Sequence, residues 1–580
     1  MPDRWQTFPV EFTGGLVTNI SPLQQGTNAP GTATVLRNFE PSIEGGYRRI
    51  KGFAKYDTNA VTNSGIVRGL TYFNDQVYAV RGNDIFRSSG SGWTQVSDTT
   101  AFPASTATAT VNGAVSSSTT LVVDANNGTI KAGMVITGTG IAGTVTVASL
   151  SDQNNLVMST AQSIDNDVAL TFTEKGPVIG GSSGKVRSLL FNFNGTDKLM
   201  LVDSTGKPFT FDGTTFKQLA DTPSDTAGAS HATVFKDHIF LGVDKTIVFS
   251  SPSNEEDFTA ALGGGTILLD AEITGLEVFR EQLYIFTHTS IFVLAGSSIS
   301  DFALKPVTRD IGCVAPDTIQ EIGGDVMFLG PDGVRLLSAT ERNNDVGLGV
   351  VSKPIQSELT ELITVSTSFT SVLLRPKSQY RLFGYNTDYS DQSARGVLAT
   401  QFSGQGGESI AWAETRGINA FVSHSAYVEN VEYIFFANDD GFVYRMEQSN
   451  GFSGADIIAT FNTPYFPITD PEVRKTIYKA ALFIDPEGSF QMEMTPQFDF
   501  NETQVIQPGA TEFTNTTQTV AFYGTSEYGT DSYGGRLKFR FDANLTGSGF
   551  LVGFNFSSTS QDPPYSLDTL VLQYGTYGRR

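Results

Sequence analysis

The segment DQVYAV at Asp75–Val80 is the first of seven copies of one short phrase, in which a polar pair precedes four mostly apolar residues. The copies recur at a period of roughly 40–50 residues, and each is followed by a turn and a second strand. A fixed period of this length, with a few strands in each unit, is typical of a β-propeller. The other six copies are DKLMLV at Asp197–Val202, DHIFLG at Asp237–Gly242, EQLYIF at Glu281–Phe286, GDVMFL at Gly324–Leu329, SQYRLF at Ser378–Phe383 and VEYIFF at Val431–Phe436.

The period is interrupted once, between Val77 and Leu199, where equivalent positions are 122 residues apart. An insert of about 75 residues would restore the period. Residues 101–175 fit this role, because they contain only two aromatic residues, Phe102 and Phe172, and are rich in Ala, Thr, Val and Ser. Their alternating segments, broken by Asn-Gly and glycine-rich turns, predict a small separate β-domain that projects from a blade.

An aromatic residue follows each of the first four phrases at an almost constant distance. Counted from the inner hairpin, the offset lies between 16 and 19 residues in all four cases. This regularity predicts one aromatic ring per blade, packed between neighbouring blades. The four residues are Trp93, Phe216, Phe258 and Phe302.

The composition agrees with an all-β protein, since the 580 residues include 59 glycines and 43 phenylalanines and only 17% are charged. We predict a β-propeller of about six or seven blades, with an inserted small β-domain and a C-terminal antiparallel platform or sandwich. The expected divisions are 1–65 for an N-terminal extended arm and hairpin of the platform, 66–100 for the first blade, 101–175 for the insert, 176–454 for the remaining blades, and 455–580 for the C-terminal platform.

The net charge of −22 is the opposite of what a protein that neutralises DNA phosphates requires. Acidity of this size keeps a large protein soluble, or it presents a surface past which DNA moves without binding. The N-terminus, MPDRWQTFPVEF, has no basic segment followed by an apolar one, and no apolar stretch approaches the ~20 residues that span a bilayer. We therefore expect synthesis in the cytoplasm of the host cell without membrane insertion.

Few motifs point to chemistry. GTGIAG at Gly138–Gly143 matches G-x-G-x-x-G, but β-branched residues follow it where a dinucleotide site needs a helix. The single cysteine, Cys313, cannot form an internal disulfide, and its apolar neighbours predict a buried, unreactive thiol. The four histidines lack metal-ligand spacing and are best interpreted as structural. They are His231, His238, His288 and His424.

Two acidic stretches are predicted to be hairpin turns, NDDG at Asn438–Gly441 and GPDG at Gly330–Gly333. Calcium binding at the first stays open, although the oxygen ladder of an EF-hand is missing. An acidic pair for glycoside cleavage also stays open, because 60 carboxylates always offer some suitable pair. We predict no catalytic, cofactor-binding or metal-binding residue, no cofactor and no enzymatic activity, and the sequence does not identify residues that would gate a channel.

Three stretches resemble the nozzle proteins of short-tailed phages, also called tail tubular protein B. They are the arm at Pro22–Gly52, RDIGCVAPDTIQEIGGDVMFLGPDGVRLLS at Arg309–Ser338 and DDGFVYRMEQSNGFSGADI at Asp439–Ile457. The likeness is greatest to T7-like phages of marine bacteria, of the cyanophage type, and it covers residues 1–100 and 176–580. The insert resembles the β-domains that decorate many phage structural proteins.

The resemblance implies a homo-hexameric tube at the distal end of a virion tail. In this family the propellers stand around a central channel and a β-platform joins the subunits. The tube attaches to a tail adaptor below the portal, holds tail fibres or spikes, retains the packaged genomic DNA and conducts it during ejection without sequence specificity. If part of the acidic charge lines the bore, DNA is repelled from the wall and slides.

Two alternatives belong to other classes of protein. A propeller enzyme or lectin that acts on surface polysaccharide would need carboxylates and tryptophans at the propeller mouth, and the chain has only three tryptophans, Trp5, Trp93 and Trp412. A side-mounted receptor-binding protein would form a trimer, whereas a nozzle forms six-fold rings. Fold alone does not decide among these functions.

Overall fold

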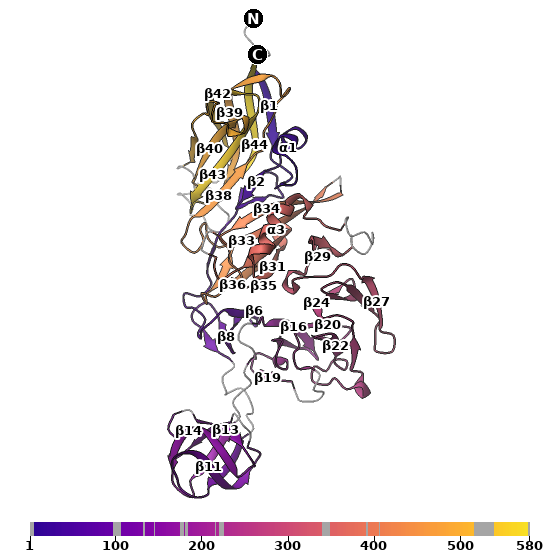
Figure 1. Ribbon diagram of the computed structural model, residues 1–580, viewed down its shortest axis with the longest axis vertical. Coiled ribbons are helices and arrows are strands. Elements are labelled where there is room, and N and C mark those ends of the chain that lie inside the picture. The colour runs from indigo at the N-terminus through magenta and orange to yellow at the C-terminus, as the bar shows by residue number, and fades with distance from the viewer. Residues whose placement is uncertain are drawn as a thin grey trace.

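The computed structural model describes residues 5–96, 106–130, 134–143, 145–173, 179, 184–214, 216–219, 226–338, 349–389, 393–404, 407–515 and 539–577. Within these ranges the chain is almost entirely β-structure, arranged as a propeller, a two-sheet platform and a small closed barrel (Figure 1). The all-β prediction, with a propeller, an inserted β-domain and a C-terminal platform, is therefore confirmed.

Seven sheets form the blades of the propeller, numbered here in chain order. Each of the seven sequence phrases forms the second strand of one blade. The first four blades are β6 (Val67–Phe73), β7 (Gln76–Arg81), β8 (Asp84–Ser88) and β9 (Thr94–Gln95); β16 (Arg187–Phe193), β17 (Thr196–Val202), β18 (Phe209–Phe211) and β19 (Phe216–Gln218); β20 (His231–Phe235), β21 (His238–Val243), β22 (Thr246–Phe249) and β23 (Gly265–Leu268); and β24 (Ile273–Phe279), β25 (Gln282–Thr287), β26 (Ile291–Ala295) and β27 (Ala303–Thr308).

The last three blades are less regular. Blade 6 follows the 3-10 turn η4 (Lys353–Ile355) and helix α3 (Gln356–Val365), which widen the spacing of the phrase before it. The strands are β28 (Gln320–Ile322), β29 (Asp325–Gly330) and β30 (Gly333–Leu336) in blade 5; β31 (Ser368–Leu374), β32 (Gln379–Tyr385), β33 (Arg395–Gly404) and β34 (Gly407–Arg416) in blade 6; and β35 (Val422–Val428), β36 (Val431–Ala437) and β37 (Val443–Met446) with β5 (Phe53–Lys55) in blade 7.

The first strands of the blades meet in a closed ring. Contacts run from β35 to β6, on to β16, β20 and β24, and from β28 to β31 and back to β35. The gap between β24 and β28 is covered by the 3-10 turn η3 (Pro316–Thr318), which contacts β24, β29 and β31. The ring fixes the number of blades at seven.

The first polar residue of the phrase has a conformational reason. The tight turn before the second strand places this residue and the one before it at positive φ, as at Asn74 (φ 45°) and Asp75 (φ 58°), or at Lys236 (φ 47°) and Asp237 (φ 62°). Two-residue hairpin loops of this kind match the twist of the flanking strands, and polar residues tolerate them best. The four residues that follow are apolar because neighbouring blades cover both faces of the second strand.

Apolar clusters join each of the first four blades to the next, as a propeller requires. The predicted aromatic rings lie in them: Phe216 packs between blades 1 and 2, Phe258 between blades 2 and 3, and Phe302 between blades 3 and 4. Trp93 packs at the seam between blade 1 and blade 7. Each ring therefore packs against the preceding blade, and this prediction is confirmed.

The ring is closed by a strand from the N-terminal segment. β5 pairs antiparallel with β37, so the outermost strand of blade 7 comes from residues that precede blade 1. The prediction that residues 1–65 belong wholly to an arm and hairpin of the platform is thus wrong for these three residues. A three-residue strand that finds its partner about 390 positions later leaves no periodic signal in the sequence.

The platform consists of two sheets around one core. The alternation seen in β40, where Phe490, Met492 and Met494 are buried and Gln491 and Glu493 exposed, is typical of a sheet covered on one face. One sheet contains β3 (Phe39–Pro41), β4 (Tyr47–Arg49), β44 (Tyr565–Tyr577), β39 (Arg474–Pro486) and β42 (Phe539–Gly549), with β1 (Gln6–Glu11) also on β44; the other adds β2 (Val35–Arg37), β38 (Ile457–Asn462), β43 (Val552–Ser560), β40 (Phe490–Phe498) and β41 (Thr511–Asn515) to the four strands of blade 6.

Blade 6 is therefore continuous with the platform. Its strand β34 pairs in parallel with β2, and hydrogen bonding continues through β38 and β43 to the edge strand β41. The apolar core of the platform likewise extends into blades 5, 6 and 7. The short helix α1 (Pro22–Asn28) lies beside the platform (Figure 1). The expected boundary near residue 455 separates two parts of one sheet, because β33 and β34 precede it and β38 follows it.

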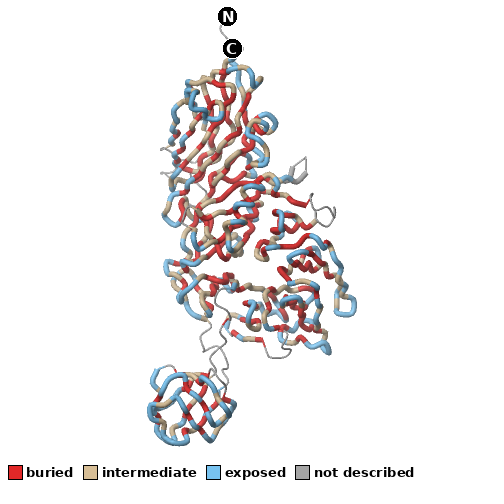
Figure 2. The backbone as a smooth tube through the Cα atoms, viewed as in Figure 1, coloured by how far each residue is buried: buried red, intermediate tan, exposed pale blue. Residues whose placement is uncertain are grey.

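The insert forms a closed six-stranded barrel with its own apolar core. It lies at the opposite end of the molecule from the two termini, and buried residues concentrate at its centre (Figures 1 and 2). Its strands are β10 (Thr106–Val111), β11 (Val115–Asn127), β12 (Val135–Gly138), β13 (Val145–Leu150), β14 (Asn155–Ile164) and β15 (Ala169–Thr173).

Candidate functional site

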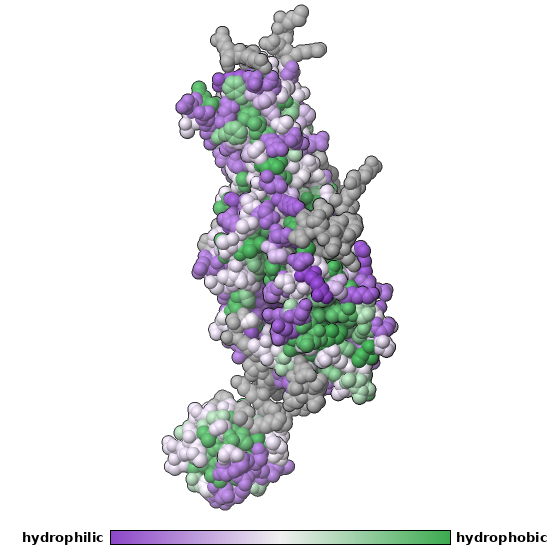
Figure 3. All heavy atoms as spheres, turned by 45° about the vertical axis from the view of Figure 1, so that its right-hand side comes forward, coloured by the Kyte–Doolittle hydropathy of each residue, from purple (hydrophilic) through white to green (hydrophobic). Residues whose placement is uncertain are grey.

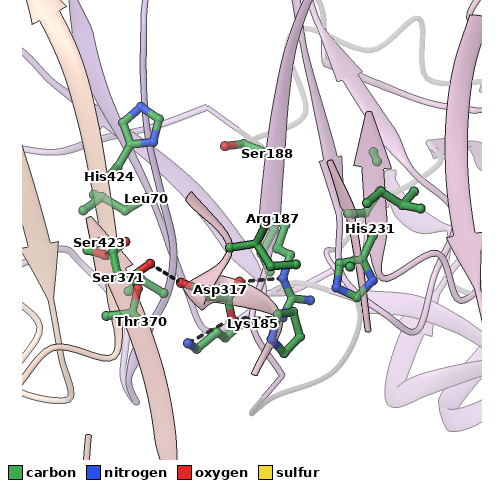
Figure 4. Close-up of a pocket in the computed structure, with 18 of the residues that line it drawn as sticks. Leu70, Lys185, Arg187, Ser188, His231, Asp317, Thr370, Ser371, Ser423 and His424 are labelled. Atoms are coloured by element: carbon green, nitrogen blue, oxygen red, sulfur yellow. Dashed lines mark hydrogen bonds and ion pairs between the residues drawn. The ribbon is translucent and has the colours of Figure 1, made fainter. Parts of the chain in front are cut away.

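The central channel of the propeller is the candidate site. A cavity of about 280 Å³ lies where the first strands of the blades converge, and all seven blades contribute residues to its wall. Ion-pairing, imidazole, carboxyl and hydroxyl groups line it together with apolar side chains (Figure 4).

An ion-paired group occupies the middle of the channel. The Arg187 guanidinium binds the Asp317 carboxylate through two contacts, Nε to Oδ1 at 2.7 Å and Nη2 to Oδ2 at 3.0 Å. The Lys185 ammonium lies 3.1 Å from Oδ2 and also donates to the Phe369 carbonyl. Burial alone would raise the pKa of Asp317, but the two cations and their hydrogen bonds outweigh it and hold that pKa well below its usual range. This group is ionised, and because its two cations share one carboxylate it carries a net charge of +1.

His231 opens β20 and faces the same cavity. Its Nδ1 lies 2.8 Å from the Ser230 hydroxyl, which itself donates to the Gly242 carbonyl at 3.2 Å. Because the hydroxyl proton is used there, the hydroxyl accepts from Nδ1–H, and Nε2 carries a lone pair. Burial, reinforced by the charge of Arg187, lowers the pKa of His231 to about 3, so the ring is neutral at pH 7.

The Nε2 atom of His231 has no hydrogen-bond partner among the described residues, although the residue is only 9% exposed. An unsatisfied acceptor buried in this way destabilises the folded state by about 1–3 kcal/mol. Buried polar atoms without a partner are rare in native proteins, and a bound group that satisfies them is one explanation.

Two further side chains line the channel from other blades. Glu277, on β24, is half-buried, and burial together with the charge of Glu321 raises its pKa to about 7. His424, on β35, is also half-buried, and burial lowers its pKa to about 4. Neither side chain makes a hydrogen bond or ion pair with any residue in the described ranges. At pH 7 the imidazole is neutral and the carboxyl is close to half-protonated.

The four histidines that were interpreted from the sequence as structural lie in different environments. Of the four histidines, His231 and His424 line the channel, His238 is buried with Nδ1 2.5 Å from the Ser250 carbonyl oxygen, and His288 is exposed. Nothing in the sequence indicated that His231, Glu277 and His424 would converge, because they come from separate blades. The one sequence signal that could have located the site was the repeat. It predicts a propeller, and in a propeller the first strand of every blade lies at the centre of the ring.

The remaining motifs have structural roles. Cys313 is fully buried, and burial raises the pKa of its thiol to about 12, so the thiol is protonated at neutral pH. The glycines of Gly138–Gly143 end β12 and turn the chain into β13, with a strand where a dinucleotide site would have a helix. The two acidic stretches, Asn438–Gly441 and Gly330–Gly333, connect consecutive blade strands as hairpins.

Within the described ranges no group of three or more His, Cys, Asp or Glu side chains is arranged to hold a metal ion. The described helices are also all too short or too polar to cross a bilayer.

A second buried cluster of charges joins the propeller to the platform. The Glu40 carboxylate, on β3, is 2.7 Å from Arg48, 2.8 Å from Lys377 and 3.0 Å from Arg381. Lys377 and Arg381 also bind Glu447 just beyond β37, at 2.7 and 2.8 Å. Glu40 and Arg381 are 2% and 1% exposed. These five residues connect β3 and β4 of the platform to blades 6 and 7.

Comparisons with known proteins give no family assignment. No protein family model and no curated protein matches the chain. Among solved structures, it is similar to the computationally designed Ika8 protein at 9% identity and a TM-score of 0.31, over 67% of this chain and 98% of that one. It is also similar to a glycoside hydrolase family 43 arabinoxylan arabinofuranohydrolase from Bacillus subtilis, solved in complex with cellotetraose, at 9% identity and a TM-score of 0.23, over 92% of this chain and 99% of that one.

The second of these structures is an enzyme. This finding contradicts the prediction that the chain has no enzymatic activity, and that prediction is withdrawn. At these TM-scores, however, neither likeness transfers a substrate or a reaction to this chain.

Proposed function

We propose that this protein is a structural component of a virion and forms the distal tail tube, or nozzle, of a short-tailed phage. The observation that supports this most is the continuity of blade 6 with the platform: one nine-stranded sheet runs from the channel-lining strand β31 to the outer strand β41. Hydrogen bonds that extend through both parts, over a shared core, suit a wall that carries mechanical load.

In the proposed assembly, DNA passes between subunits and not through a propeller. The channel of one propeller contains a cavity of only about 280 Å³. Arg187, Lys185 and Asp317 line this cavity and are joined by ion pairs. A DNA duplex therefore has no path through a single chain. Six subunits around a common bore would each contribute a net charge of −22, and the part that lines the bore would keep DNA from binding the wall.

Lateral contacts in a ring need apolar surface on the subunits. Exposed apolar side chains occur in blades 3 and 4, where Leu262 is 64%, Leu268 is 76% and Ile299 is 47% exposed. Figure 3 turns this side of the propeller towards the viewer and shows an apolar area there. The proposal also includes the partners expected from the sequence: a tail adaptor under the portal, tail fibres or spikes, and genomic DNA in transit.

The test is the symmetry of the assembled protein. The full chain is purified and examined by mass photometry and negative-stain electron microscopy. The nozzle proposal expects six-fold rings with a mass six times the 62.4 kDa of one chain, and six projecting barrels. Trimers would favour the receptor-binding alternative and overturn the proposal, as would a protein that stays monomeric at micromolar concentration and also fails to form rings with its tail adaptor.

A further inference from the structure

We propose that the central channel of the propeller binds a single monosaccharide unit, an uncharged ring that carries several hydroxyl groups. This inference concerns the inside of one propeller, and it does not depend on the structural role proposed above.

The unpaired Nε2 atom of His231 is the first argument. It is a buried acceptor that faces the cavity, and its tautomer is fixed by the Ser230 hydroxyl, which is itself committed to the Gly242 carbonyl. The group that satisfies it must donate a hydrogen. A sugar hydroxyl donates one hydrogen and accepts two, so it can bind this atom and a second channel group at once.

The second argument is charge. The Lys185 and Arg187 cations both bind Asp317 (Figure 4), and they also donate to the Phe369 and Ser230 carbonyls, so these donors are already used within the protein. Both channel histidines are neutral at pH 7, because burial lowers their pKa values to about 3 and about 4. The histidines therefore supply no counter-ion, and an uncharged polar ligand loses less free energy of hydration on burial than a charged one.

The third argument is the distribution of polar groups around the cavity. His231, Glu277 and His424 come from blades 3, 4 and 7, so they approach a central ligand from separate directions. In Figure 4 the two histidines lie on opposite sides of the Arg187–Asp317–Lys185 group. A ring with hydroxyl groups around its perimeter matches polar groups that converge in this way.

The fourth argument is the apolar part of the cavity wall and the volume of the cavity. Apolar side chains, among them Leu276, Ile319 and Val422, lie between the polar groups and can contact the C–H faces of a sugar ring. The volume of about 280 Å³ is just below the range of roughly 300–1,000 Å³ usual for drug-sized ligands. The channel therefore suits one ring and excludes a chain of several.

Saturation-transfer difference NMR on the full 580-residue chain tests this proposal. The probes are glucose, galactose, mannose, arabinose, xylose and N-acetylglucosamine, each at millimolar concentration. We expect saturation transfer to at least one of them. Methyl glycosides of that sugar then separate two sources of the ligand: transfer to a methyl glycoside indicates the terminal unit of a longer glycan, and transfer to the reducing sugar alone indicates a free monosaccharide.

Variants test whether the sugar that gives saturation transfer binds in the channel. His231→Phe keeps a ring of similar size but removes the Nε2 acceptor, and the loss of one hydrogen bond should weaken binding about 3- to 10-fold. His288→Phe is the matched control, because His288 is exposed and does not line the cavity, and it should leave binding unchanged. Glu277→Leu is a second test if His231→Phe does not fold: it removes a carboxyl that burial already disfavours, and it should also weaken binding.

Two results would overturn the proposal. One is the absence of saturation transfer to every sugar of the panel. The other is transfer to His231→Phe, or to Glu277→Leu, that equals transfer to the unmodified protein, since binding would then take place elsewhere on the surface.

Discussion

Removing the charge of Glu40 should loosen the connection between propeller and platform. The Glu40→Gln change keeps the size of the side chain but leaves Arg48, Lys377 and Arg381 without their shared carboxylate, which lies 2.7–3.0 Å from each. Each cation keeps one other acidic partner, Glu487 for Arg48 and Glu447 for Lys377 and Arg381, so the change removes the one carboxylate that all three share.

The size of the effect follows from burial. Glu40 is 2% exposed, and removing one partner of a buried ion pair typically destabilises a protein by about 3–5 kcal/mol, because the remaining charges stay buried. A matched control is available on the surface. Glu256 pairs with Lys217 at 2.5 Å, but the two side chains are 42% and 48% exposed, so Glu256→Gln should change stability by less than about 1 kcal/mol.

Urea unfolding of the full chain, followed by tryptophan fluorescence, measures both variants. Trp412 lies fully buried on β34, in the sheet that connects the two parts, so its emission reports on this region. Midpoint shifts are compared under the same conditions, because a protein of this size need not unfold in one step. If Glu40→Gln shifts the midpoint no further than Glu256→Gln does, the cluster does not hold the two parts together.

The same cluster should make stability depend on acid. Burial raises the pKa of Glu40, but the charges of Lys377, Arg48 and Arg381 outweigh it and hold the folded-state pKa far below the ordinary 4.5. The unfolded state therefore binds a proton first as the pH falls, and the stabilisation present above about pH 4.5 is lost progressively below it. Glu40→Gln should flatten this part of the curve of melting temperature against pH.

Three further predictions concern other parts of the molecule. Glu277 has its pKa raised to about 7, so stability should fall as the pH rises from about 4.5 to 7, and Glu277→Gln should melt higher than the unmodified protein at pH 8 and equally at pH 4; equal melting at both pH values would contradict this. A Cβ at Gly52 would lie 1.9 Å from the Gly451 carbonyl oxygen, so Gly52→Ala should lower the melting temperature by the equivalent of about 1–3 kcal/mol, whereas Gly509→Ala, which meets open space, should not. The isolated segment 101–175 should fold alone and melt cooperatively by circular dichroism, because its closed barrel has a separate core, and a random-coil spectrum would refute this.

The repeated phrase predicted the propeller because it reports two strong local constraints at once: a turn with two residues at positive φ, and a strand covered on both faces. The low aromatic content of residues 101–175 likewise identified the insert, since a small barrel packs with short aliphatic side chains. Both signals are local in the sequence, and local signals are what sequence patterns record best.

The features that the sequence did not reveal all depend on distant partners. β5 has only three residues and pairs with β37, and blade 6 joins the platform through the parallel pairing of Arg37 with Glu414. The polar groups of the channel are equally dispersed, because His231, Glu277 and His424 share no motif and meet only when the ring closes. No spacing rule connects such residues before the number and order of the blades are known.

The closure of blade 7 by β5 has a consequence for biosynthesis. β5 leaves the ribosome before the strand it pairs with, since β37 follows about 390 residues later. Synthesis of that stretch takes roughly 20 to 80 seconds at bacterial translation rates of about 5–20 residues per second. β1 waits longer still, because its partner β44 lies about 560 residues further along the chain. The nascent polypeptide thus carries unpaired strand edges until β37 and β44 have been made, and these edges need protection from premature association until then.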